Sequence, residues 1–273
     1  MVRLGRKQAV KPDPAQEQMS LTEHLAELRM RIIRAGLAVL IGAILVLAFY
    51  DTVLGWLVRP YRDLCRRKPD GYCGTSYDPV EDKVVLFILD PVEGLTTRLR
   101  VAFYGGMILA LPVVLWQIWK FVVPALHKNE KRYAIGFVLS STVLFIAGGA
   151  IAFTTLGKAL EFLIDWAGAD VDQAFQVNSY IRLVTLMVIA FGVGFTIPVM
   201  LVFLELMNVL QPQTLLGAWR YAVVGTFVVA AAITPSGDPI SLLALSVPMI
   251  FLYFVAILIG WFVQRRRRKK AAN

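Results

Sequence analysis

The stretch Trp119–Arg132, WKFVVPALHKNEKR, lies between two apolar runs and decides how they are connected. One run enters it from Leu99, and the next leaves it at Tyr133. Pro124 and the polar residues that follow are typical of a break between helices. Each flanking run is near or above the ~20 residues that cross a bilayer as a helix. The stretch therefore predicts a short loop at a membrane surface, with a membrane-spanning helix on either side.

The composition of the whole chain is that of a membrane protein. Of its 273 residues, 58% are apolar and 17% are charged, and the mean hydropathy is +0.65. A soluble domain is nearer half apolar and a quarter charged. Lipid offers no hydrogen-bond partners, so the spans must be helices, because the alternating pattern of a membrane barrel is absent. We therefore expect an all-α, polytopic membrane protein with a single domain.

Six apolar runs predict six transmembrane helices. The fifth run holds only about twelve residues, fewer than the ~17 of a comfortable crossing. Residues 51–97, 154–178 and 211–221 are expected to be loops, and the first of these begins with an amphipathic stretch suited to the membrane interface. The six expected spans are Ile32–Tyr50, Arg98–Val123, Tyr133–Leu156, Ile181–Met207, Ala222–Ile233 and Ile240–Val263.

The basic residues predict the orientation of these spans. Six spans place both termini on one side, and nearly two thirds of the 28 Lys and Arg residues fall on that side. Cytoplasmic loops carry such an excess, so both termini are predicted to be cytoplasmic. We divide the chain into a disordered basic tail at 1–19, a six-helix domain at 20–263 and a basic tail at 264–273. No nucleic-acid motif accompanies the net charge of +9, so no nucleic-acid partner is expected.

Two acids stand in basic surroundings on the predicted cytoplasmic side. Glu27 precedes the first span and is spaced to pair with Arg31, a contact worth only about 0.2–0.5 kcal/mol. Glu130 follows the second span in a loop rich in Lys and Arg. Taken alone, each acid is explained as half of a surface ion pair. Two such acids at two membrane-entry points also fit a site for a cationic ligand.

Residues for catalysis or metal binding are missing from the sequence. His24 and His127 are the only histidines, and neither has a partner at metal-ligand spacing. No phosphate loop or nucleophile elbow occurs. The spans carry almost no ionisable residue beyond Glu205, which we expect near the cytoplasmic interface. The sequence therefore indicates no metal, no cofactor and no enzymatic activity.

The two cysteines, Cys65 and Cys73, lie together in the predicted external loop. Between them, Pro69-Asp70-Gly71 is a turn signal that could bring them close to each other. Cysteines confined to one loop that faces an oxidising compartment suggest a disulfide. We expect Cys65 and Cys73 to be bonded.

Several motifs, taken in their order and spacing, resemble the TatC family, the multi-spanning subunit of the twin-arginine protein translocase. The resemblance covers nearly everything from Ser20 to Val263. The motifs are His24-Leu25-x-Glu27-Leu28-Arg29, Gln117-x-Trp119, Phe121-x-x-Pro124-Ala125-Leu126-x-x-x-Glu130, Ala190-Phe191-Gly192-Val193-x-Phe195 and Thr234-Pro235.

The resemblance implies a receptor for signal peptides that carry two consecutive arginines. Such a subunit is also the core scaffold of a translocase that exports folded proteins across the bacterial cytoplasmic membrane, driven by the proton-motive force. TatA-like and TatB-like single-span proteins are the implied partners, with the bilayer around them and further copies of the same chain in the complex.

The resemblance also implies a set of site residues. Glu27 and Glu130 match the acids implicated in arginine recognition, and Phe121 matches an aromatic residue of the same site. Carboxylates suit this role, because a guanidinium presents a planar fork that a carboxylate can meet with two hydrogen bonds. Arg29 and Gln117 complete the expected signal-peptide site.

One position departs from the family pattern. Thr196 stands in the fourth span where the family often carries a glutamate associated with partner contacts. A hydroxyl bonded to its own backbone carbonyl is the simplest explanation for this threonine. Thr196, Thr234 and Asp238 are the partner-contact residues that we expect.

Two other classes of function remain open from the residues alone. A small-molecule secondary transporter commonly shows an internal repeat with paired broken helices, and no such similarity is evident in the chain. An intramembrane enzyme would need a nucleophile or a metal cluster. Neither class is favoured over a translocase receptor.

Overall fold

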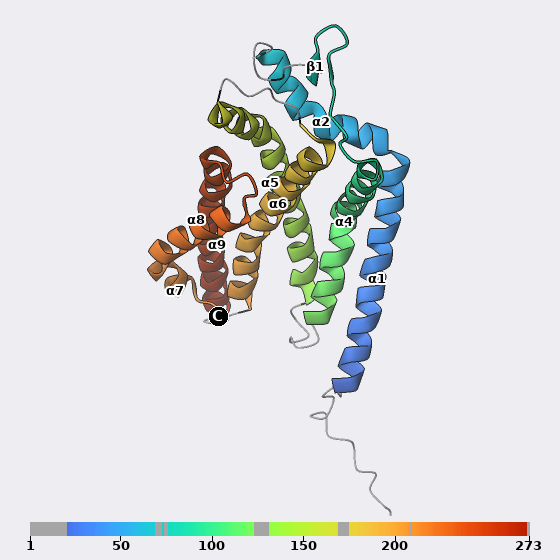
Figure 1. Cartoon of the computed structure of the whole chain (residues 1–273). Coiled ribbons are helices and arrows are strands. Elements are labelled where there is room, and N and C mark those ends of the chain that lie inside the picture. The colour runs from blue at the N-terminus through green and yellow to red at the C-terminus, as the bar shows by residue number, and fades with distance from the viewer. Residues whose placement is uncertain are drawn as a thin grey trace, which may run out of the picture.

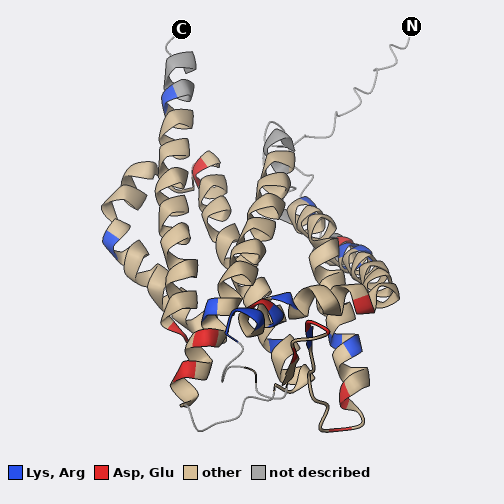
Figure 2. Ribbon diagram, turned by 90° about the horizontal axis from the view of Figure 1, so that it is seen from above, with Lys and Arg blue, Asp and Glu red and all other residues tan. Residues whose placement is uncertain are grey.

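Long apolar helices form the body of the protein (Figure 1). The computed structural model describes residues 21–68, 73, 76–122, 131–168, 175–207 and 209–271. Within these residues, 5 helices are long and apolar enough to cross a membrane, and they are almost uncharged over most of their length (Figure 2). The prediction of an all-α, polytopic protein is confirmed. The helices are α1 (Leu21–Ala48), α4 (Glu93–Val122), α5 (Lys131–Ala167), α6 (Val177–Leu206) and α9 (Pro239–Ala271).

The fifth predicted span is a shorter helix, α8 (Trp219–Ile233). Its 15 residues correspond to about 22 Å at 1.5 Å per residue. The hydrocarbon core of a typical bilayer is about 30 Å thick. The apolar part of α8 alone is therefore too short to cross a bilayer of ordinary thickness.

The helix ends separate into two faces (Figure 1). The start of α1, the end of α4, the start of α5 and the end of α9 lie together on what we call the tail face. Opposite them, on the hairpin face, lie α2 (Tyr50–Arg67) and the antiparallel pair β1 (Tyr77–Asp78) and β2 (Lys83–Val84). Both described ends of the chain are thus on one face, as the predicted topology requires.

Two glycines let α1 and α4 approach each other closely. A Cβ atom added to Gly42 would lie 2.7 Å from the carbonyl oxygen of Gly106. A Cβ atom added to Gly106 would lie 2.4 Å from the backbone nitrogen of Ala43. Small residues at such crossings let membrane helices gain van der Waals contact where lipid gives no hydrophobic drive to associate. The pair α1–α4 therefore depends on the absence of side chains at these positions.

Helix α2 lies across the hairpin face and covers the outer part of α5. Tyr61 of α2 is fully buried, and Tyr180 of α6 donates a hydrogen bond to the carbonyl of Leu57 at 2.9 Å. The α5 residues beneath α2 are buried at helical spacing: Leu156, Ala159, Leu160 and Ile164. The expected loop at 154–178 is therefore wrong for its first half. Helix α5 continues to Ala167 because its apolar stripe packs beneath α2.

A buried carboxylate joins the start of α4 to the start of α6. Glu93 is 4% exposed and accepts hydrogen bonds from the backbone nitrogens of Leu89 and Asn178, each at 2.9 Å, and from Nε2 of Gln176 at 3.0 Å. Beside it, the backbone nitrogen of Val177 donates to the carbonyl of Phe87 at 3.0 Å. The long loop is thereby attached to α6 by backbone as well as side-chain contacts.

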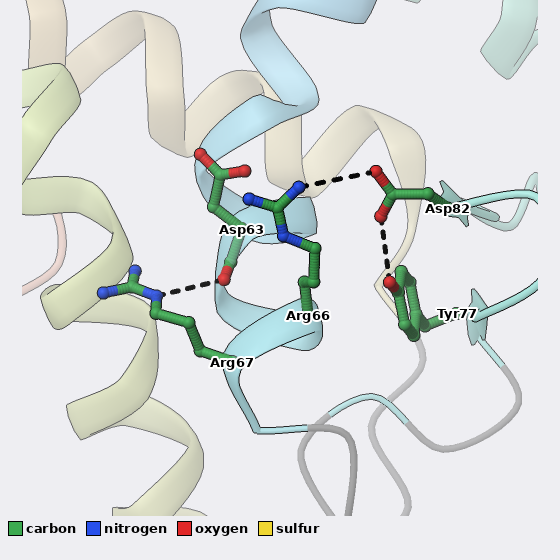
Figure 3. A network of polar contacts seen from close by, with 5 residues as sticks. All are labelled: Asp63, Arg66, Arg67, Tyr77 and Asp82. Carbon is green, nitrogen blue, oxygen red and sulfur yellow. Dashed lines mark hydrogen bonds and ion pairs between the residues drawn. The ribbon is translucent and has the colours of Figure 1, made fainter.

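The end of α2 is tied to the β-hairpin by polar contacts (Figure 3). Asp82 accepts a hydrogen bond from the hydroxyl of Tyr77 at 2.9 Å and pairs with Arg66 at 3.9 Å. Next to them, Nε of Arg67 donates to the carbonyl of Asp63 at 3.1 Å. A disulfide joins Cys65 to Cys73, with Cα atoms 5.7 Å apart and both residues buried.

One further segment differs from the expected loops, and the last helix is longer than the expected span. The loop expected at 211–221 contains a helix, α7 (Pro212–Gly217), and the first residues of α8. Pro212 occupies the first helical turn, where a missing N–H costs nothing. The basic segment from 264 onward continues α9 as far as Ala271.

We expect Gly106→Ala to destabilise the protein. The added methyl group meets backbone atoms of α1, and overpacking of this kind costs about 1–3 kcal/mol. Gly36→Ala is the matched control, because a Cβ there meets nothing within 4 Å and alanine has the higher helix propensity. The midpoint of thermal unfolding in detergent should fall for Gly106→Ala alone. Equal midpoints for the two variants would contradict the close packing.

We expect the denatured, unreduced protein to take up no thiol reagent. Both cysteines are buried, so the labelling must be done after unfolding. Closing so short a loop contributes about 2–3 kcal/mol in the chain-entropy model. A maleimide–polyethylene glycol gel shift should add two labels after reduction and none before it. Cys73→Ala is the control and should add one label without reduction. Labelling of the unreduced wild type would show that the bond is absent.

Candidate functional site

A groove on the tail face lies between the first turns of α1 and the last turn of α4. Its volume is about 570 Å³. Among the described residues, one acid and three bases line it, and these four side chains sum to two positive charges. We call it the α1–α4 groove, and its lining residues are Ala26, Glu27, Met30, Arg31, Arg34 and Lys120.

Glu27 lies in this groove and already has a partner. Its Oε2 accepts a hydrogen bond from Nη2 of Arg31 at 3.1 Å. The predicted i,i+4 pair is thus confirmed. The Glu27 side chain is 35% exposed and that of Arg31 is 14% exposed. Nη1 of Arg31 is buried, and no residue in the described part of the chain accepts a hydrogen bond from it.

The α4 wall of the groove is held in place by an aromatic cluster. Trp119 is 3% exposed, and its ring lies 4.3 Å from that of Phe203 on α6 and 5.0 Å from that of Phe137 on α5. The ring of Trp116 also packs on the cluster and lies 5.3 Å from Nζ of Lys120. These contacts fix the last turn of α4, and with it the position of Lys120 beside α1.

The other residues of the expected signal-peptide site lie around this groove or outside the described residues. Arg29 is exposed on α1. Gln117 and Phe121 are half-buried in the last turns of α4, and Oε1 of Gln117 is buried with no hydrogen-bond donor among the described residues. The structure therefore brings Glu27 to the same end of the molecule as Gln117 and Phe121. Glu130 lies outside the described residues.

Each of the three expected partner-contact residues has a hydrogen-bond partner inside the chain. The hydroxyl of Thr196 donates to the carbonyl of Val193 at 2.6 Å, which is the local bond expected from the sequence. The hydroxyl of Thr234 donates to the carbonyl of Ala230 at 2.6 Å. Fully buried Asp238 accepts from the backbone nitrogen of Ser241 at 2.6 Å, so it caps the start of α9. Their role as partner contacts stays a prediction.

Glu205 is the second-last residue of α6, and it is buried there rather than open to the surroundings. It is 2% exposed, and neither carboxylate oxygen has a hydrogen-bond partner among the described residues. Its carboxylate faces α9 at Gly260, where an added Cβ atom would lie 2.1 Å from Oε2. Gly260 has no side chain, and this leaves room for the carboxylate of Glu205. The sequence around either residue alone could not indicate this contact, because the two residues lie on different helices.

Sequence reasoning assigned no site role to Arg34 or Lys120, both of which line the groove. Helical spacing could have found part of the groove, because residues 27, 31 and 34 follow one face of a helix. The pairing of that face with the end of α4 depends on how the two helices cross. The close contact of Gly42 with Gly106 sets that crossing.

Comparison with known proteins gives one consistent result. The family described as "Sec-independent protein translocase protein (TatC)" matches residues 23–248. A Sec-independent protein translocase protein TatC of Frankia casuarinae is 35% identical over 91% of this chain and 67% of its own length. That of Aquifex aeolicus is 34% identical over 92% of this chain and 98% of its own length.

A solved structure agrees with this result. A crystal structure of a twin-arginine translocase receptor, TatC, superposes with a TM-score of 0.67 at 31% identity, covering 89% of this chain and 100% of the other. The family match spans most of the chain, and the fold agrees over nearly the same length. The chain therefore belongs to the TatC family of Sec-independent protein translocase proteins.

Proposed function

We propose that this protein is the signal-peptide receptor and core scaffold of a twin-arginine translocase in a bacterial cytoplasmic membrane. The translocase exports folded cargo with the proton-motive force, and the tail face is the cytoplasmic face. Membership of a family of translocase components, which are not catalytic enzymes, supports this function. The excess of Lys and Arg on the tail side supports the orientation.

The observation that carries the proposal is the half-exposed carboxylate of Glu27 in the α1–α4 groove. A cargo arginine would replace Arg31 on this carboxylate. On an exposed helix surface an i,i+4 pair contributes only about 0.2–0.5 kcal/mol. Here the displaced Arg31, whose side chain is 14% exposed, must also find another acceptor. The incoming guanidinium gains a charge-assisted hydrogen bond in its place.

Glu130 is the proposed second carboxylate, so that two arginines meet two acids. Phe121 supplies an apolar surface against which the stem of an arginine can pack. Gln117 has a buried carbonyl oxygen that can accept a hydrogen bond. Arg29 weakens the negative field of the acids, so it raises selectivity at some cost in affinity.

TatA-like and TatB-like single-span proteins are the proposed partners, together with further copies of this chain. The short helix α8 supports the proposal that the membrane-spanning helix of such a partner docks beside it. Apolar side chains on it are exposed, among them Val224 at 63% and Val228 at 62%. A bilayer becomes thinner around a helix that is too short to cross it. A single-span partner with a short apolar segment would match this thinner bilayer and could therefore lie beside α8.

We expect Glu27→Ala and Glu130→Ala each to weaken signal-peptide binding by about ten-fold, equivalent to about 1.4 kcal/mol. Each variant loses a charge-assisted contact, and Glu130→Arg should be worse because it adds repulsion. The measurement is site-specific crosslinking of a labelled precursor to membranes that carry each variant. Glu81→Ala, an exposed acid on the hairpin face, is the matched control. Wild-type crosslinking by both Glu27→Ala and Glu130→Ala would show that the site is assigned wrongly.

We expect Arg31→Gln to strengthen precursor binding by a few-fold, because it releases the Glu27 carboxylate from its partner in the chain. Arg34→Gln removes the same charge one turn away, but Arg34 forms no ion pair with Glu27. Titration of a fluorescent signal peptide against both variants separates the lost ion pair from the general loss of positive charge. Equal gains would mean that Arg31 is not a specific competitor.

A further inference from the structure

The positive charge of the α1–α4 groove exceeds what one acid can neutralise. Among the residues that the structure describes, Arg31, Arg34 and Lys120 face a single carboxylate, that of Glu27. Among the described residues, neither Arg34 nor Lys120 forms an ion pair, and Nη1 of Arg31 is buried without an acceptor. A buried N–H donor without an acceptor is costly. The groove therefore has both the charge and the free donors to bind an anion.

The positions of Arg31 and Arg34 along α1 indicate how far they lie from the middle of the bilayer. Helix α1 ends at Ala48, directly before α2 on the hairpin face. At 1.5 Å per residue, Arg34 lies about 21 Å and Arg31 about 26 Å from that end. The hydrocarbon core is about 30 Å thick. Measured from Ala48, the two Cα atoms are therefore about 4–9 Å short of the tail-side boundary of the core. Helical side chains tilt toward the N-terminus, so the long arginine stems can carry both guanidinium groups up to the phosphates of the tail-side leaflet.

An apolar track leads from the groove toward the middle of the membrane. Met30 and Arg34 are followed on the same face of α1, at helical spacing, by Leu37 and Ile41. The exposed fractions are 51% for Met30, 52% for Leu37 and 60% for Ile41. A basic pocket that continues into an exposed apolar stripe matches an amphiphile with an anionic head and acyl chains, rather than a free phosphate ion.

We propose that an anionic phospholipid of the cytoplasmic leaflet binds in the α1–α4 groove, with its phosphate on Arg31, Arg34 and Lys120 and its acyl chains along Leu37 and Ile41. Basic pockets between membrane helices on the cytoplasmic side are suited to such headgroups. Arg31 is then shared between the lipid phosphate and Glu27. Binding of the lipid does not require that Glu27 bind cargo.

The affinity test uses the purified, delipidated full-length protein in detergent. Fluorescent phosphatidylglycerol is titrated against it, with fluorescent phosphatidylcholine as the zwitterionic comparison. Phosphatidylglycerol should bind at least ten-fold more tightly. Arg34→Gln and Lys120→Gln should each weaken it about five-fold, whereas Arg220→Gln, which removes a base outside the groove, should not. Equal affinity for the two lipids, or equal loss in Arg220→Gln, would overturn the proposal.

Two further experiments distinguish binding of a lipid from binding of a free anion. Inorganic phosphate at millimolar concentration should not displace the bound phosphatidylglycerol, and displacement would show an anion site without a role for the acyl chains. Phosphatidylglycerol with a photoactivatable acyl chain should label the part of α1 that contains Leu37 and Ile41. Labelling confined to α8 or α9 would overturn the proposed position. Because no arm uses a signal peptide, these outcomes are independent of the receptor function.

Discussion

The contact of Gly42 with Gly106 is the constraint on which the site depends. In lipid, two helices attract each other mainly through close packing, so a single methyl group at this crossing separates them. The crossing sets the angle between α1 and α4 and brings Lys120 beside Glu27 and Arg31. The aromatic cluster around Trp119 then holds the other side of α4 against α5 and α6. Glycines in the middle of the membrane thus position charges at its surface.

Much of the fold could be predicted from the sequence, because the length of an apolar run and the distribution of Lys and Arg are local properties. The short α8 and the pair Glu27–Arg31 belong to this class. What failed depended on contacts between distant segments. Helix α5 extends beyond its predicted membrane span because α2 covers its outer part. Glu93 is buried by its contacts with the start of α6, and Glu205 is buried against α9.

Of the signal-peptide residues predicted from the sequence, Glu27 lines the groove, whereas the groove's remaining charged residues come from how the helices pack. The sequence around Glu27 predicted a carboxylate in basic surroundings, but it gave no sign that Lys120 of α4 would lie beside it in the folded groove. A surplus of positive charge beside the proposed receptor carboxylate disfavours a single cationic ligand group. A cargo arginine can offset this repulsion by its geometry, because a guanidinium offers five donors in a fixed fork that a carboxylate can meet with two hydrogen bonds.

The polar contacts of the hairpin face have a mechanical consequence. Glu93 fastens the start of α4 to the start of α6, while the disulfide and α2 brace the same end. With that end clamped, α4 would tilt about Glu93, and it would carry with it the α5 and α6 residues that pack on its last turn. Its 30 residues make an arm of about 45 Å, so a tilt of about 5° displaces the far end by about 4 Å. A small change of angle between helices is thereby amplified where the groove opens.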